Sequence, residues 1–221
     1  MPKPQLAIFD FCGTLIRFQT ADRYVNFCVE RLKGNKIVQC RHRLVQMMDK
    51  FRIFKIYNRI KPSNNFRKRV ILWQLKGLSY RLCNQMAKQY FETELLPAVV
   101  SPLIDKLQEH LAQNDRVIIL SGGYDIYIHY FAAYFGVEET VSSKIAFKNN
   151  VCLGKMDGED CMKYNKVRAI QSLMTGVTSY CYTDSISDLP LLEIVDNPIV
   201  VSKQTPQKWA SQRNYKQIIW N

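Results

Sequence analysis

The sequence predicts an α/β protein with a mostly parallel sheet and a helical insertion. Short apolar runs end at polar residues, helical patterns separate these runs, and a long helical stretch follows the first run. Parallel strands need crossover connections, so this alternation favours a parallel sheet. The insertion is too long for a loop, so we expect it to form a helical unit of its own.

The individual elements follow from local pattern. Apolar runs at residues 6–11, 116–120, 179–183 and 199–201 are expected to be strands. Helices are expected over about 101–113, 124–135 and 166–174, in a short segment up to Val195, and from about Pro206 onward. Alternation over residues 141–153, with Asn149-Asn150 between the halves, predicts a hairpin.

We expect two domains: an α/β core of residues 1–16 plus 97–221, and a helical domain of residues 17–96. Within the helical domain, Leu44, Met47, Met48, Phe51 and then Phe54 or Lys55 recur at helical spacing. Breaks in the pattern are expected at residues 61–65 and at Gly77.

The composition is that of a globular protein. Apolar residues make up 47% and charged residues 23% of the 221 residues, which excludes collagen-like and disordered classes. No apolar run is long enough to span a bilayer, and the first residues lack a signal-peptide pattern. The odd number of cysteines and the lack of a C-x-x-C pair predict that the protein is located in a reducing cytoplasm. Five cysteines with apolar neighbours are expected to be buried: Cys28, Cys40, Cys83, Cys152 and Cys181.

Positive charge is concentrated in the insertion. Residues 17–96 hold 18 Lys or Arg and 5 Asp or Glu, whereas the whole chain carries a net charge of +12. Such an asymmetry indicates both a domain and an anionic partner.

Three predicted strands end at candidate functional residues: Asp10, Ser121 and Asp184. In parallel sheets, ligands bind beyond the carboxyl ends of the strands, so we expect a site where these residues meet. Asp10 can attack phosphorus to form an acyl phosphate, although a strand-ending Asp also commonly caps a turn. Ser121 can hold phosphate oxygens at a helix start, or simply cap that helix.

The remaining candidates are a lysine and two acids. Lys166 can neutralise a transferring phosphoryl group, although neighbouring Lys163 competes for this role. Asp184 and Asp188 are well placed to bind Mg²⁺, a hard cation that takes few protein carboxylates. Acids at a helix start are also favoured by the helix dipole, which explains Asp188 better than Asp184.

Taken together, DFCGTL at Asp10, LSGG at Ser121, Lys166 and TDSISDLPLL at Asp184 resemble the motifs of the haloacid dehalogenase superfamily, closest to its phosphoserine-phosphatase-like subfamily IB. The resemblance covers nearly the whole chain. It implies a Rossmann-like core with a C1-type helical cap inserted after the first motif. It also implies phosphomonoester hydrolysis with Mg²⁺ as cofactor.

The resemblance also implies a role for each matched residue. Asp10 corresponds to the nucleophile and a metal ligand, the backbone carbonyl of Cys12 to a second ligand, and Asp184 to a third. Asp188 orders the site. The phosphate-binding residues are expected to be Thr14, Ser121, Gly122 and Lys166.

Cys12 departs from the family pattern, which usually has Asp two positions after the nucleophile as general acid and base. A thiol with a pKa of about 8.5 is a poorer proton donor than a poised carboxylic acid. Losing such a group typically costs roughly 10²–10⁴-fold in rate. We therefore expect slow hydrolysis; the alternatives are a phosphotransferase and a catalytically silent phosphate- or membrane-binding module.

The basic insertion admits two interpretations. Residues 41–61 mix basic and apolar side chains, as in a helix that lies on an anionic membrane, which would suit lipid-linked phosphomonoesters. We favour the alternative, a helix with a buried apolar stripe and a solvated basic face, because any helical bundle needs such a stripe. Nucleic acid is a lesser alternative, because a basic face binds phosphates without sequence preference but no nucleic-acid-binding module is recognisable.

Overall fold

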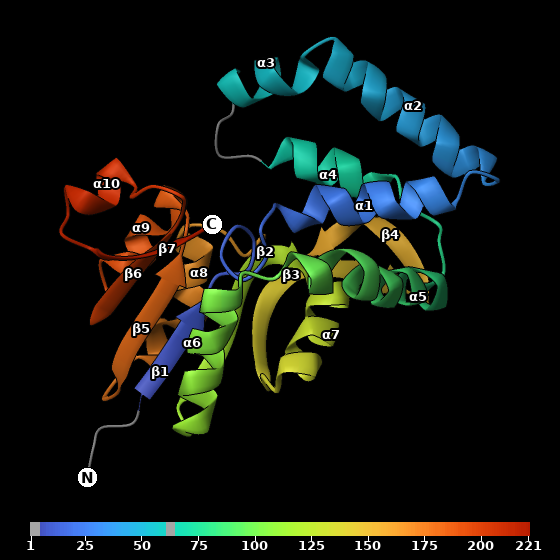
Figure 1. The fold of residues 1–221 in the computed structure, drawn as a ribbon. Helices are drawn as coiled ribbons and strands as arrows, with labels where there is room; N and C mark the ends of the chain where they lie inside the picture. Colours follow the sequence, from blue (N-terminus) through green and yellow to red (C-terminus); the bar gives the residue numbers. More distant parts are fainter. Residues whose placement is uncertain (1–4, 61–64) are drawn as a thin grey trace.

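A seven-stranded sheet runs through the computed structural model, which describes residues 5–60 and 65–221 (Figure 1). The strand order is β4-β3-β2-β1-β5-β6-β7. The strands are β1 (Gln5–Phe9), β2 (Arg116–Tyr124), β3 (Glu139–Lys148), β4 (Val151–Asp157), β5 (Thr178–Thr183), β6 (Asn197–Lys203) and β7 (Lys216–Trp220). Every neighbouring pair is parallel except β3 and β4, so the predicted mostly parallel α/β class is confirmed.

The central strands are apolar on both faces because helices cover both sides. Along β1, Ala7 and Phe9 belong to one hydrophobic cluster, and Leu6 and Ile8 belong to another. This division follows from the two-residue period of a strand. The first cluster includes residues of α6 (Ser101–Ala112) and α7 (Asp125–Phe135), and the second includes residues of α8 (Tyr164–Ile170), α9 (Leu189–Leu192) and α10 (Lys208–Ser211).

The predicted hairpin is confirmed. Strands β3 and β4 pair antiparallel, and Asn149 and Asn150 join them with φ angles of 49° and 61°. Asparagine tolerates this left-handed conformation better than most residues, because its side chain bonds locally.

The C-terminal prediction is wrong in part. The helix expected from Pro206 is α10, which spans only Lys208–Ser211, and the chain then forms the edge strand β7. The short sequence KQIIW lacks the strict alternation that predicts a strand. It forms one because β6 offers an open parallel edge from Ile199 to Lys203.

In the described residues, five α-helices lie between β1 and α6: α1 (Thr20–Arg31), α2 (Lys36–Lys50), α3 (Ile53–Ile60), α4 (Phe66–Trp73) and α5 (Tyr80–Tyr90), followed by the short turns η1 (Phe91–Leu95) and η2 (Leu96–Ala98). Tyr24 and Tyr90 of this inserted segment pack against Tyr127 of α7, with ring centroids 5.3 and 5.4 Å from it. The inserted segment and the sheet therefore share one hydrophobic cluster. The predicted break at Gly77 follows α4, whereas residues 61–64 of the other predicted break lie outside the described residues.

Part of the apolar stripe expected to be buried in this segment is exposed, whereas Phe54 is buried in the main hydrophobic cluster and Met48 packs against it. Leu44, Met47 and Phe51 are 48%, 53% and 63% exposed, and Cys40 is exposed as well, contrary to prediction. The side chains that α2 buries are Val38 and Val45. Helical spacing predicts which residues share a face, but packing alone decides which face turns inward.

In the part of the chain that the structure describes, no helix is long and apolar enough to cross a membrane.

Candidate active site

The predicted strand ends meet at one edge of the sheet. Asp10 follows β1, Asp184 follows β5, and Ser121 lies within β2; these three strands are neighbours in the sheet. The backbone N–H of Asp10 donates to the carbonyl of Tyr182 at 2.9 Å, which ties the end of β1 to β5. Parallel pairing therefore gathers side chains that lie more than a hundred positions apart in the sequence.

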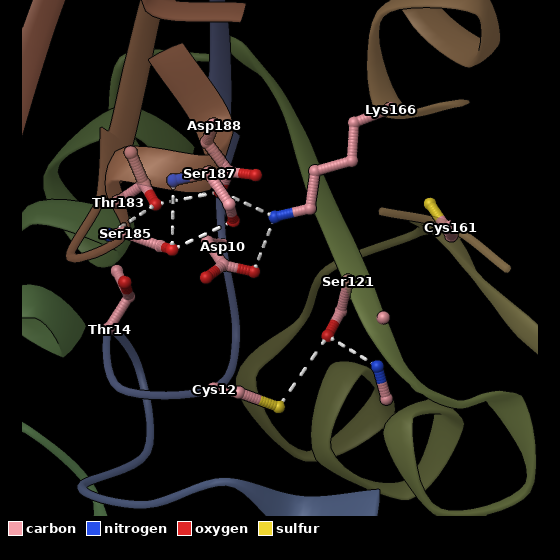
Figure 2. A network of polar contacts seen from close by, with 12 residues as sticks. Asp10, Cys12, Thr14, Ser121, Cys161, Lys166, Thr183, Ser185, Ser187 and Asp188 are labelled. Carbon is pink, nitrogen blue, oxygen red and sulfur yellow. Dashed lines mark hydrogen bonds and ion pairs between the residues drawn. The ribbon is translucent and has the colours of Figure 1, made fainter. Parts of the chain in front are cut away.

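Lys166 joins the acids of this site, as Figure 2 shows. Its ammonium group donates to Asp10 Oδ1 at 2.8 Å and to Asp188 Oδ2 at 2.7 Å. Thr183 Oγ1 also donates to Asp188 Oδ2, at 2.8 Å. Lys166 is 4% exposed whereas the competing Lys163 is exposed, so it is Lys166 that reaches the acids.

Burial sets the charge balance of this cluster. Desolvation works to lower the pKa of Lys166, but Asp10 and Asp188 outweigh it and raise that pKa, so the ammonium stays charged. Burial raises the pKa of Asp10 to about 6, against the opposing effect of Lys166. The site thus holds a carboxylate that ionises near neutral pH beside a permanent positive charge.

Asp184 lies directly against the loop that follows β1. A Cβ atom added to Gly13 would stand 2.2 Å from Asp184 Oδ2, and Gly13 has a φ of +83°. Both facts require glycine at this position. Thr14 Oγ1 donates to Asp184 Oδ1 at 3.2 Å and accepts from the Asp184 N–H at 3.0 Å.

Asp10 and Asp184 suit a hard divalent cation. Burial and the charge of Asp10 raise the pKa of Asp184 to about 7. Within residues 5–60 and 65–221, no group of three or more His, Cys, Asp or Glu side chains could hold a metal ion. Mg²⁺ fits a poorer donor set, since it takes one or two carboxylates and keeps several waters.

Cys12 begins a buried chain of hydroxyl groups. The Sγ of Cys12 lies 3.0 Å from Thr20 Oγ1 and 3.9 Å from Ser121 Oγ. Thr20 Oγ1 in turn lies 2.7 Å from Tyr127 Oη. Burial and the charge of Asp10 raise the pKa of the Cys12 thiol. A thiol in this environment stays protonated at neutral pH and is a weak hydrogen-bond donor.

The LSGG motif forms a bulge rather than a helix cap. Strand β2 continues through Tyr124, and its register with β3 shifts between Ser121 and Tyr124. Ser121 Oγ accepts from the Gly123 N–H at 2.9 Å, and Gly122 lines the adjoining cavity. A bulge beside a functional site re-aims side chains and backbone groups toward it.

The inserted segment completes the cavity. A cavity of about 460 Å³ is lined by core residues, including Asp10, Cys12 and Lys166, and by Asn65, Arg67 and Lys68 of the insertion. Lys68 pairs with Asp160 and donates to the Gly122 carbonyl and to Ser143 Oγ. Arg67 pairs with Asp22 of α1. The cavity thus has acidic and basic side chains on both the sheet side and the insertion side.

The structure brings together most of the predicted residues but gives some of them other contacts. The side chain of Thr14 is buried and bonds Asp184, and neither Thr14 nor Ser121 is among the residues that line the cavity, so the phosphate contacts of both stay predictions. Sequence reasoning missed Asn65, Arg67 and Lys68. The only signal was the basic run FRKR, and nothing local distinguishes those side chains from the other basic residues of the insertion.

Comparison with known proteins agrees with this arrangement. Residues 7–193 match the sequence profile of the haloacid dehalogenase-like hydrolases. A comparison of the sequence with curated proteins finds no match.

Solved structures share the fold. A protein of unknown function from Bordetella pertussis Tohama I is similar with a TM-score of 0.80 and 21% identity over 98% of both chains. A phosphoserine phosphatase solved as a phospho-aspartyl intermediate analogue has a TM-score of 0.65 and 17% identity, over 99% of this chain and 94% of that one. A substrate-bound phosphoserine phosphatase has a TM-score of 0.64 and 15% identity, over 99% and 93%. At these identities the likeness establishes the fold.

Proposed function

The chain belongs to the haloacid dehalogenase-like hydrolase family, and from this membership we propose that it is a phosphatase that forms a phospho-aspartate at Asp10. The observation that carries the proposal is the buried contact of Lys166 with both Asp10 and Asp188 at the cavity wall. A buried lysine beside a carboxylate nucleophile supplies positive charge where a phosphoryl group would gather negative charge.

The reaction has two steps. A carboxylate oxygen of Asp10 attacks phosphorus, and the bond from phosphorus to the ester oxygen breaks as the leaving group takes up a proton. Water then attacks the acyl phosphate, which releases inorganic phosphate and restores the carboxylate. Lys166 holds the Asp10 carboxylate in position, and Ser121 Oγ, which accepts from the Gly123 N–H, is proposed to donate to a phosphate oxygen.

Mg²⁺ is the proposed cofactor, held by Asp10, Asp184 and the backbone carbonyl of Cys12. A bound Mg²⁺ neutralises charge on the phosphoryl group. Thr14 and Gly13 keep Asp184 against the loop that carries Asp10 and Cys12, which supports this ligand set.

Cys12 is proposed to limit the rate. A neutral thiol bonded to Thr20 neither protonates a leaving group nor activates water as well as a carboxyl group does. Hydrolysis is therefore expected to be slow for alkyl phosphates and faster for aryl phosphates, whose leaving groups need little protonation. The same weakness favours a second candidate function, transfer of the phosphoryl group from Asp10 to an acceptor other than water.

The substrate is proposed to be a small or lipid-linked phosphomonoester. The cavity is about 460 Å³, within the range of small-molecule sites, and Arg67 and Lys68, each paired with an acid, line it together with Asp10. Residues 17–96 are proposed to act as a cap domain over a core of residues 1–16 and 97–221. The cytoplasmic location inferred from the cysteine pattern stays a prediction.

The test is phosphate release from aryl, alkyl and lipid phosphomonoesters with and without Mg²⁺. We expect Mg²⁺-dependent release that Asp10→Asn abolishes and that Asp157→Asn, at an exposed acid, leaves unchanged. Cys12→Asp is expected to raise the rate for alkyl phosphates by roughly 10²-fold. Phosphorylated glycerol in place of free phosphate would favour the transferase. No release even with Cys12→Asp would favour a silent phosphate- or membrane-binding module.

A further inference from the structure

Helices α2 and α3 carry a row of large, exposed apolar side chains that belong to neither hydrophobic cluster of the described residues. We call them the outer face: Ile37, Leu44, Met47, Phe51, Ile53, Ile56 and Ile60, each between 39% and 72% exposed. Within each helix they follow a spacing of three, four or seven residues, so they lie on one side of it. In Figure 1 these two helices lie farthest from the sheet.

The opposite sides of both helices already supply their packing. Val38, Val45 and Phe54 are buried in the main hydrophobic cluster, and the ring of Phe54 lies 5.8 Å from that of Phe66 in α4. The outer face is therefore not needed to hold α2 and α3 on the protein. Apolar surface of this extent on a helix pair usually marks an interaction site.

Basic residues accompany this apolar row. Lys36, Arg43 and Lys50 are exposed and follow one another at seven-residue intervals, which places them in a line beside the row. Residues 33–60 contain eight Lys or Arg and a single acidic residue, Asp49. An occupant of the outer face must therefore offer both apolar matter and negative charge.

A second copy of this chain does not meet that requirement. Two outer faces packed together would bring the line of Lys36, Arg43 and Lys50 near its own copy, and like charges at such an interface repel. An anionic bilayer meets both needs. Its acyl boundary accepts the apolar row, and long basic side chains extend from the row to the lipid phosphates.

We propose that the outer face of α2 and α3 binds the surface of an anionic lipid bilayer, with the two helices lying in the interface. This inference goes beyond the proposed phosphatase activity and does not depend on it. It also places α4, which follows α3 and carries the cavity residues Arg67 and Lys68, on the protein side of the membrane contact.

The test is co-sedimentation of the full chain with vesicles of phosphatidylcholine alone and of phosphatidylcholine mixed with phosphatidylserine. We expect binding to the anionic vesicles that weakens as salt is added. Arg43→Gln with Lys50→Gln should weaken it roughly 25-fold, because each basic residue near such a surface contributes about a fivefold factor. Leu44→Gln with Phe51→Gln should weaken it by at least about 10-fold.

Matched controls lie on the core. The apolar control is the double variant Tyr134→Gln with Ile219→Gln, at positions that are 61% and 45% exposed. The basic control is Lys208→Gln with Lys216→Gln, at two exposed lysines. Both double variants should leave vesicle binding unchanged. All variants should keep the unfolding temperature and aryl phosphate hydrolysis of the native chain, which separates this test from that of the phosphatase.

Three results would overturn the proposal. The first is no binding to anionic vesicles at low salt. The second is an equal loss of binding in the outer-face and the core variants. The third is self-association of the native chain, seen by analytical ultracentrifugation and lost in Leu44→Gln with Phe51→Gln, which would make a second copy the occupant.

Discussion

The proposed catalytic edge of the sheet, where Asp10, Lys166 and Asp188 meet, buries charged side chains, whereas the outer face of α2 and α3 exposes apolar ones. At the catalytic edge, charged groups are buried: Asp10, Lys166 and Asp188 are 7%, 4% and 2% exposed. On the outer face, apolar groups such as Phe51 and Ile60 are exposed at 63% and 72%.

Both regions contradict the simple rule that charge lies outside and apolar residues lie inside. Buried charge is tolerable only where partners are held in place, so the catalytic edge depends on its fixed contacts. Exposed apolar surface carries no such requirement, so the outer face can change without loss of the fold. Four predictions test this difference, from the largest expected effect to the smallest.

Lys166→Met should have the largest effect. It leaves Asp10 and Asp188 buried without their cation, so we expect phosphatase activity to be lost and the free energy of unfolding to fall by about 4 kcal/mol. Arg168→Met is the control on the same helix, because the side chain of Arg168 is 61% exposed; it should change stability by less than about 0.5 kcal/mol. Urea unfolding measures both, and equal losses would contradict the comparison.

Lys68→Met breaks the ion pair that joins the inserted segment to the core. The side chains of Lys68 and Asp160 are 12% and 8% exposed, so we expect a loss of about 3 kcal/mol, measured by the same unfolding experiment. Arg69→Met, at an exposed neighbouring position, should have little effect. A negligible loss for Lys68→Met would mean that the pair does not anchor α4.

Adjacent residues of α2 give a direct contrast between its two sides. Val45 is 8% exposed, so Val45→Ala should cost about 1.5 kcal/mol for the two methyl groups lost from the cluster. Leu44 is 48% exposed, and Leu44→Ala should cost less than about 0.5 kcal/mol. The reverse order in thermal unfolding would show that the outer face is packed in solution.

Mg²⁺ should stabilise the protein more as pH rises. The pKa values of Asp10 and Asp184 are raised to about 6 and about 7 from 3.8, so the folded state favours their protonated forms. Their contribution to stability without metal is present below about pH 4 and is lost as pH rises to about 7. Mg²⁺ competes with those protons, so its stabilising effect should be about 1 kcal/mol larger near pH 8 than near pH 5.

Differential scanning fluorimetry with and without Mg²⁺ measures this change. Asp184→Asn should remove most of the Mg²⁺ effect, whereas Asp157→Asn should retain it. A Mg²⁺ effect that is independent of pH would contradict the assignment of the two carboxylates as ligands.

Local pattern was sufficient for much of the core. The runs that became β1, β2 and β5 are apolar on both faces, and each carries its polar residue where the strand reaches the sheet edge. Strand β7 escaped prediction, because its pairing with β6 depends on an edge that exists only in the folded protein. The position of Lys68 in the cavity was not predicted for the same reason, since its partner Asp160 lies 92 positions away in the sequence.

The sequence by itself determined the succession of strands and helices up to β6, the candidates Asp10, Ser121, Lys166 and Asp184, and the concentration of basic charge in residues 17–96. These features depend on local periodicity and on which residue ends a run. Only the tertiary structure decided that Lys166 rather than Lys163 meets Asp10, and that α2 buries Val45 rather than Leu44. Both choices depend on which side of a helix faces its neighbours, and spacing along one helix cannot specify that.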